Sequence, residues 1–277
     1  MRMKNSFDTS KFFAYLFVLT GALIMLAPFY FMFVFATHSR TEIFSMPPPL
    51  WFGSALLDNM SILTEKIPFW KNLGWSLYVA IASTVLTLLF CSMAGYAFAL
   101  MDFKYKNFLF AWVLGTMLIP SFMNMIPTFM VMDLLGWIDE HRALYLPGAA
   151  GAFGIFLMRQ FASTAIPKEL IEAARMDGAG PMRFFKDILL PLSATNIAAL
   201  FVIQFIYGWN QYLWPLLVTT NEDMYPIVMG IKRMLAGEAY TEWNVVMATA
   251  ILAMLPPALV VILMQKWFVK GLVDTEK

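Results

Sequence analysis

The chain has 277 residues, of which 60% are hydrophobic and 13% are charged, and its net charge is +1. Soluble domains carry about 25% charged residues, so this chain cannot cover a water-facing surface and needs a bilayer as part of its solvent. The near-zero net charge, without a basic face, excludes a nucleic-acid partner. The single cysteine, Cys91, lies in an apolar run and is expected to be buried, and it excludes an internal disulfide framework or a zinc-type cluster.

Six uncharged stretches approach the roughly 20 residues that a helix needs to cross a bilayer. The expected spans, in chain order, are 12–37, 72–101, 107–132, 143–161, 192–219 and 243–267. The first is longer than the apolar region of a signal peptide, which has about 7–15 residues, so a retained helix is expected. The fourth extends past Arg159, because an arginine near a helix end can reach the interface. The sequence predicts an all-α, polytopic membrane protein with one transmembrane domain over 1–277.

Lysine and arginine are distributed unevenly between the segments that join the spans. With the N-terminus in the cytoplasm, 13 of the 19 Lys and Arg residues fall on the inner side and 6 on the outer side. Because inner loops carry the excess of these residues, the sequence predicts that both termini are cytoplasmic. The polar segment between the fourth and fifth spans then lies on the cytoplasmic side as well.

No span carries an ionisable residue near its centre. Proton-driven and voltage-driven membrane proteins use ionisable groups at depth, so any energy source is expected to lie elsewhere. The chain also has no G-x-x-x-x-G-K-[ST] loop and cannot hydrolyse ATP by itself. The sequence therefore predicts a chain without catalytic residues, a metal site or a bound cofactor.

The segment 167–191, which we call the elbow, places a cluster of charges between two apolar spans. Pro167 suits the first turn of a helix, where its missing N–H is not needed. The residues from there to Met176 are strong helix formers. Gly178 then indicates a helix stop, because glycine readily adopts the left-handed conformation that ends helices.

A second short helix is expected to open at Pro181, and Pro191 marks its end or a kink at the start of the fifth span. The elbow therefore reads as two helices with small residues at the tip between them: Ala173, Ala174, Gly178, Ala179 and Gly180. One interpretation is an amphipathic hairpin that lies on the membrane surface. The other is a docking site for a soluble partner, in which the small residues enter a cleft and Glu172 meets a basic group.

The elbow resembles the EAA motif of bacterial ABC importer permeases, with every motif residue at its expected gap. The residues that carry the resemblance are Glu172, Ala173, Ala174, Gly178, Ile188, Leu190 and Pro191. The resemblance implies a coupling helix that lies in a groove of an ATP-hydrolysing subunit and transmits its closure to the membrane helices. The ATPase-docking residues that it implies are Leu170, Glu172, Ala173, Ala174, Met176, Asp177, Gly178, Ala179 and Pro181.

The length and span layout are similar to the MalG-type permeases of carbohydrate importers, which have a MetI-like fold. The segment GAGPMRFFKDILLPLSATNIAALFVIQFIYGWNQYLWPLL and the tail GLVDTEK resemble permeases of sn-glycerol-3-phosphate importers in particular. This implies an inner-membrane complex with a homologous second permease, two ATP-binding subunits that hold ATP and Mg, and a periplasmic solute-binding protein. Glycerophosphodiesters and a di- or oligosaccharide are the alternative substrates.

Several amides lie within or near the spans, where an unpaired amide is costly. The candidates for the substrate pathway are Asn124, Gln204, Asn210 and Gln211. Hydrogen bonding between helices is the alternative explanation for each of them. Because no cation lies at membrane depth, an anionic substrate would be recognised by helix N-termini and amides, by the second permease, or by the external binding protein. The outer segments 38–71 and 221–243 are the candidate docking surfaces for that protein.

Two other classes of protein stay open at this point. A secondary transporter or channel would work without ATP, although the spans lack a group for ion coupling. A membrane scaffold would use the elbow to recruit a soluble partner without transporting anything.

Overall fold

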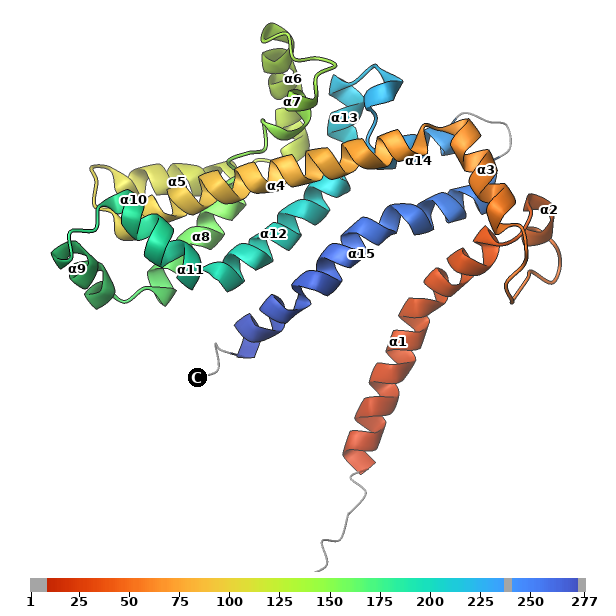
Figure 1. Cartoon of the computed structure of the whole chain (residues 1–277), viewed down its shortest axis with the longest axis horizontal. Helices are drawn as coiled ribbons and strands as arrows, with labels where there is room; N and C mark the ends of the chain where they lie inside the picture. Colours follow the sequence, from red (N-terminus) through yellow and green to blue (C-terminus); the bar gives the residue numbers. More distant parts are fainter. Residues whose placement is uncertain (1–8, 237–240, 274–277) are drawn as a thin grey trace, which may run out of the picture. The chain divides into compact units, whose positions relative to one another are not determined.

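The computed structural model describes residues 9–236 and 241–273, and within these ranges all regular structure is helical. Contacts divide the chain into two units. The smaller unit comprises Met1–Ile67 and Ile231–Ala253, and the larger one comprises Pro68–Gly230 and Met254–Lys277. Figure 1 shows the helices of both units.

Three helices form the body of the larger unit: α4 (Phe69–Leu100), α8 (Ala152–Ala165) and α12 (Ala194–Trp209). Both α8 and α12 pack along α4 (Figure 1). Glycines make the contacts close. A Cβ on Gly95 of α4 would lie 2.6 Å from the Cβ of Met158 in α8, and a Cβ on Gly208 of α12 would lie 2.8 Å from the hydroxyl of Ser83 in α4. Small residues at the crossing points are typical of helix pairs in membranes.

Helix α4 also carries buried hydroxyl groups, on Ser76, Ser83, Thr84, Thr87 and Ser92. Thr84 and Ser83 donate hydrogen bonds back to the carbonyl of Ala80, at 2.6 and 3.1 Å. This bonding within the helix satisfies polar groups that cannot reach water. Cys91 on the same helix is fully buried, as expected from the sequence.

The other helices of the larger unit are shorter. They are α5 (Lys106–Thr116), η1 (Ser121–Asn124), α6 (Met125–Leu134), α7 (His141–Tyr145), α9 (Lys168–Met176), α10 (Pro181–Phe184), η2 (Phe185–Leu189), α11 (Leu190–Leu192), α13 (Leu213–Val218) and η3 (Glu222–Met224). Helix α14 (Ile227–Ala236) begins in this unit, and α15 (Trp243–Val273) ends in it.

Three single helices of the described residues are long and apolar enough to cross a membrane: Lys11–Ala36, Phe69–Leu100 and Trp243–Trp267. Two bent pairs pass the same test together: Lys106–Thr116 with Ser121–Leu134, bent by 97°, and Pro181–Leu192 with Ala194–Trp209, bent by 79°. The expected third span, 107–132, therefore holds a sharp break at residues 117–120, which ends at Pro120. The expected fourth span, 143–161, covers α7, a break at 146–151 and part of α8. Six spans with cytoplasmic termini stay a prediction.

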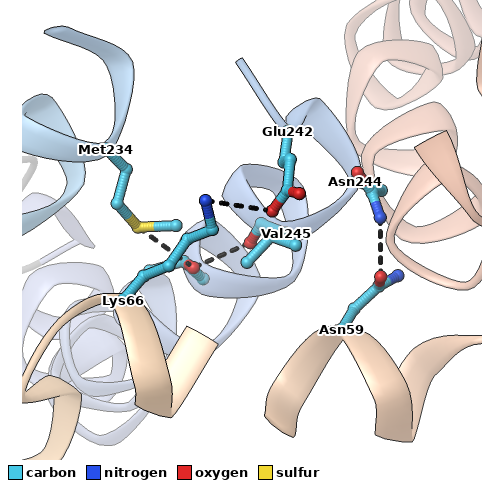
Figure 2. A network of polar contacts seen from close by, with 7 residues as sticks. Asn59, Lys66, Met234, Glu242, Asn244 and Val245 are labelled. Atoms are coloured by element: carbon cyan, nitrogen blue, oxygen red, sulfur yellow. Dashed lines mark hydrogen bonds and ion pairs between the residues drawn. The ribbon is translucent and has the colours of Figure 1, made fainter. Parts of the chain in front are cut away.

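The smaller unit joins the end of α1 (Thr9–Ala36) to α2 (Arg40–Ile43), α3 (Leu56–Lys66) and the start of α15. Asn59 of α3 is the centre of this junction and is 2% exposed. Its amide nitrogen donates to the carbonyls of Ala36 (2.8 Å) and His38 (2.9 Å), and its amide oxygen accepts from Asn244 of α15 at 2.6 Å. Figure 2 shows this pair beside the ion pair of Lys66 and Glu242.

The nitrogen of Lys66 lies 3.2 Å from the carboxylate of Glu242, and both side chains are less than one third exposed. The ion pair and the hydrogen bond between Asn59 and Asn244 are thus both largely shielded from water. The two contacts together hold α3 against the first turn of α15.

In the larger unit, Asp139 fastens the segment before α7 to the segment after α13. Its carboxylate accepts hydrogen bonds from the backbone N–H groups of Thr220 and Asn221, the second at 3.0 Å, and from the Thr220 hydroxyl at 2.6 Å. The hydrogen bond from the Thr220 side chain is the main reason that the pKa of Asp139 lies below its ordinary value. Asp139 also has φ +60°, a left-handed conformation that Asp and Asn tolerate better than most residues.

We expect Asp139→Ala to weaken the contact between the segment before α7 and the segment after α13, because three hydrogen-bond donors lose their charged acceptor. The amide protons of Thr220 and Asn221 should exchange with solvent roughly tenfold faster, which corresponds to about 1.4 kcal/mol of local stability. Hydrogen exchange of the protein in nanodiscs measures this, and Asp133→Ala, on the exposed face of α6, serves as the control. Protection unchanged by Asp139→Ala would contradict the assignment.

The stabilisation by the hydrogen bonds to the Asp139 carboxylate should depend on pH. Because the folded-state pKa of Asp139 is lowered, the carboxylate stabilises the fold fully above its ordinary pKa near 3.8. That contribution is lost as the pH falls through the lowered, folded-state pKa. Exchange at Thr220 should therefore differ between wild type and Asp139→Ala at neutral pH and become equal at strongly acidic pH.

Candidate functional site: the elbow

The first helix of the elbow, α9, begins directly after Pro167, which occupies the N-cap position with φ −61° and ψ 143°. The proline thus lies one position earlier than the first-turn position expected from the sequence. Glu169 lies in the first turn and Arg175 in the last, and both charges complement the helix dipole. A helix of nine residues is too short to be stable alone, so packing on its apolar face must hold it.

Helix α9 ends in a Schellman motif around Gly178, as the sequence indicates. Gly178 has φ +73°. Its N–H donates to the carbonyl of Arg175 at 3.0 Å, and the N–H of Ala179 donates to the carbonyl of Ala174 at 2.9 Å. These two bonds satisfy carbonyls at the helix end. They also turn the chain sharply toward the second helix of the elbow.

The second helix begins at Pro181, which lies at its first position behind Gly180 as N-cap. It continues as a π-helical turn, η2, and then as α11, and it ends at Ser193 rather than at Pro191. The bend of 79° between this helix and α12 falls at Ser193. The elbow therefore enters the membrane body through a sharp corner.

The inner face of the elbow packs against the end of α4. Its buried residues are Ala162, Ile166, Ala174, Phe184, Phe185 and Leu189. Tyr96 of α4 stacks on Phe184, with ring centroids 5.8–5.9 Å from those of Phe184 and Phe185. Leu170 and Ile171 of α9 are half-buried against the same cluster. The two helices of the elbow and α4 are thus expected to move together, because they can separate only if the contacts of this cluster are broken.

A cavity of about 380 Å³ lies beside this cluster, between the end of α4 and the tip of the elbow. Its walls include Leu100 and Asp102 on one side and Arg175, Ala179 and Pro181 on the other. The packing beneath the tip is therefore incomplete on this side.

The outward face of the elbow is exposed and mixed in charge. Glu172, Ala173, Asp177 and Gly178 are exposed, and the Met176 side chain is 84% exposed. An ion pair of Arg183 with Asp187, at 3.6 Å, lies along the second helix and is worth little at such exposure. An exposed methionine beside small residues and a carboxylate is suited to contact with another protein.

Of the residues that the resemblance assigns to ATPase docking, Ala174 lies in the buried cluster, and Leu170 and Ala179 are half-buried. The outward-facing set is Glu172, Ala173, Met176, Asp177, Gly178 and Pro181. Tyr96 and Phe184, which support the elbow from behind, were not singled out by the sequence. Their aromatic character at the end of a span gives only a weak signal, because such residues are common there.

The four amides named as pathway candidates lie at three places in the larger unit. Asn124 is exposed at the end of η1, and Gln204 is half-buried in α12. Asn210 caps α12 and donates to the carbonyl of Ile206 at 2.9 Å. The buried amide oxygen of the half-buried Gln211 accepts no hydrogen bond from the described residues. The hydrogen bonds within the described ranges do not join these amides to one another.

An all-helical membrane body with a helical elbow defines a class of transport permease. The fold is similar to that of a bacterial ABC transporter involved in the import of the acidic polysaccharide alginate, with a TM-score of 0.83, 21% identity, and coverage of 97% of this chain and 99% of that one. Residues 91–274 match the family model of the binding-protein-dependent transport system inner membrane component.

The chain belongs to this family of inner-membrane transport components. It is 44% identical to the sn-glycerol-3-phosphate transport system permease protein UgpE of Brucella melitensis, over 97% of this chain and 98% of the relative. It is 45% identical to the UgpE of Pectobacterium atrosepticum and 43% identical to that of Escherichia coli, over 96% of both chains in each case. The chain is thus an ABC importer permease of the inner membrane, a subunit of a transporter complex and not an enzyme.

Proposed function

We propose that this permease forms half of the translocation pore of an importer for sn-glycerol-3-phosphate. The observation that supports this substrate is the sequence identity of 43–45% to the three UgpE permeases over almost the whole chain. The second half of the pore is a homologous permease. A periplasmic binding protein delivers the solute, with the outer segments 38–71 and 221–243 as its candidate docking surfaces.

The elbow connects this pore to ATP hydrolysis on two partner subunits, which hold ATP and Mg. The outward face of α9, with Glu172, Met176 and Gly178, enters a cleft of one ATPase subunit. Closure of the ATPase dimer pulls the elbow, and the packing of Ala174 and Phe184 against α4 passes this displacement to the membrane helices. ATP binding thereby opens the pore outward, and hydrolysis returns it to the inward-facing state.

The phosphate of the substrate meets no cation at the centre of the described spans. Amide side chains therefore take part in the passage of the solute, and Gln211 is the strongest of the four candidates for accepting a hydrogen bond from its hydroxyl groups. Its buried amide oxygen is without a hydrogen bond in the described residues, so the side chain has unused capacity for a hydroxylated solute. Recognition of the phosphate itself belongs chiefly to the binding protein.

Reconstitution of the complete transporter in proteoliposomes tests this function. Glu172→Lys should reduce ATP-dependent uptake of sn-glycerol-3-phosphate by at least about tenfold, because a reversed charge in a protein cleft costs more than about 1.4 kcal/mol. Glu169→Lys is the matched control, since Glu169 is exposed on the same helix but outside the motif, and it should retain uptake. ATP hydrolysis stimulated by the loaded binding protein should fall with uptake.

Other outcomes identify the other classes of protein. Uptake that continues without ATP would show a secondary transporter. Absence of uptake for every substrate tested, with the partners still bound, would show a scaffold. Uptake of glycerophosphodiesters or an oligosaccharide in preference to sn-glycerol-3-phosphate would keep the mechanism and change the substrate.

A further inference from the structure

The segment 44–52 of the smaller unit, which we call the apolar loop, exposes large hydrophobic side chains. It joins α2 to α3, and no charged residue lies between Glu42 and Asp58. The exposed fractions are 64% for Phe44, 95% for Met46, 55% for Leu50, 78% for Trp51 and 61% for Phe52. Apolar side chains gathered in this way on a surface mark a site of interaction with a membrane or a protein.

The C-terminal part of the apolar loop is attached to the side of α1. The hydroxyl of Tyr30 donates to the carbonyl of Leu50 at 2.6 Å, and the ring of Tyr30 meets the ring of Phe52 edge to face at 6.0 Å. Just past the loop, the N–H groups of Gly53 and Ala55 donate to the hydroxyl and the carbonyl of Thr37, each at 2.8 Å.

A glycine is required where the chain leaves the apolar loop. A Cβ on Gly53 would lie 2.6 Å from the carbonyl oxygen of Thr37 and 2.9 Å from the ring of His38. The chain is thus pressed against the end of α1 at this point, and the loop has a fixed place beside the helix.

This attachment sets the depth of the loop relative to α1. Tyr30 lies six residues before Ala36, the last residue of the helix, so its backbone is about 9 Å below the helix end, and the carbonyl of Leu50 lies within reach of its side chain. The candidate span Lys11–Ala36 has 26 residues, whereas about 20 cross the hydrocarbon core. Counted from Lys11, the boundary between hydrocarbon and headgroups falls close to Tyr30, and a tilted helix would carry Tyr30 deeper.

We infer that the apolar loop is inserted in the bilayer, in the leaflet that contains the C-terminal end of α1. Its backbone lies at the level of the headgroups, and Leu50, Trp51 and Phe52 reach the acyl boundary. Tyrosine and tryptophan are enriched at this depth, where their rings bridge the apolar and polar regions. The loop fixes the depth of α1 and, through Asn59, of the junction with α3 and α15.

Lipid accounts for this surface better than a soluble protein does. Only 6% of the apolar 18-residue stretch within the span Lys11–Ala36 is buried inside this chain, so the apolar loop continues a surface that is already suited to lipid. A periplasmic protein would have to reach the side chain of Tyr30, whose backbone lies about 9 Å below the end of α1, to contact Leu50. The candidate docking surface on segment 38–71 is thereby reduced to its polar parts, such as the exposed face of α3.

Spin labelling of the complete transporter tests the insertion. Cysteines replace Leu50 or, as the control on the exposed face of α3, Glu65, each in a Cys91→Ala background. Nitroxide labels on these positions are compared in liposomes of phosphatidylethanolamine and phosphatidylglycerol for collision with oxygen, which partitions into lipid, and with a water-soluble nickel chelate. The Leu50 label should show an oxygen-to-nickel collision ratio several-fold above that of the Glu65 label.

Each other result would overturn the inference. A Leu50 label that collides with nickel as often as the Glu65 label lies in water. A Leu50 label that is immobile and protected from both reagents is covered by a partner protein.

Tyr30→Phe supplies a second measurement that keeps the apolar ring and removes only the hydroxyl bonded to Leu50. The collision ratio at Leu50 should then fall toward that of Glu65, while the ratio of a label on Leu23, in the exposed middle of α1, stays unchanged. An unchanged ratio at Leu50 would show that Tyr30 does not set the depth of the loop. None of these results depends on the identity of the transported solute.

Discussion

Gly178→Val is expected to reduce ATP-driven uptake by about tenfold or more while the transporter still assembles in the membrane. Gly178 has φ +73°, and no atom lies within 4 Å of the place that a Cβ would take, so the backbone conformation and not crowding requires glycine. A left-handed conformation costs an ordinary residue about 1–2 kcal/mol, and a β-branched one more. This strain should break the hydrogen bonds of the Schellman motif and shift the position of α9. ATP hydrolysis would then be uncoupled from transport.

Two further variants separate this explanation from a loss of small residues in general. Gly180→Val should retain most of the uptake, because Gly180 has φ −67° and also has open space around it. Gly178→Asn should fall between wild type and Gly178→Val, since asparagine tolerates the left-handed conformation. Equal losses for Gly178→Val and Gly180→Val would contradict a role of the backbone conformation at Gly178.

Gly95→Leu is the second substitution with a large expected effect, on the stability of the membrane body. Even a Cβ at this position would lie 2.8 Å from the backbone nitrogen of Arg159. A flexible side chain could change its rotamer to relieve such a contact, but the backbone cannot. Helices α4 and α8 must therefore move apart, which loosens the buried cluster around Cys91, Met158 and Leu200. Overpacking of this kind costs about 1–3 kcal/mol.

The measurement is the thermal unfolding midpoint of the purified permease in detergent, which Gly95→Leu should lower. The matched control is Gly74→Ala on the same helix, where no atom lies within 4 Å of the new Cβ. Replacing glycine by alanine in a helix favours the helix by roughly 0.5–1 kcal/mol, so Gly74→Ala should leave the midpoint unchanged or raise it. A Gly95→Leu midpoint equal to that of wild type would contradict the close crossing of α4 and α8.

The local features of the elbow could be predicted because they depend on neighbouring residues. Gly178 and Pro181 indicate the helix end and the next helix start through backbone preferences that act within a few residues. The division of α9 into a buried face with Ala174 and an exposed face with Glu172 follows from helical spacing. The all-helical membrane class follows from composition alone.

Features that depend on contacts distant in sequence could not be predicted. Asp139 meets Thr220 across 81 positions, and Asn59 meets Asn244 across 185. Nothing local distinguishes these residues from other polar residues within or between the expected spans. The sharp break near Pro120 could not be predicted either, since a proline in a span indicates a break or an ordinary kink equally well. The fastening of the apolar loop by Tyr30 likewise exists only in three dimensions.

Photo-crosslinking from Met176 tests the coupling role of the elbow most directly. A photoreactive amino acid replaces Met176, whose side chain is 84% exposed at the tip, in the assembled transporter in native membranes. The account predicts a covalent adduct with the ATPase subunit that is absent when the reactive residue is placed instead at Glu65, which the predicted topology assigns to the outer side. Adducts with lipid alone, in membranes where the ATPase subunit is present and active, would contradict it.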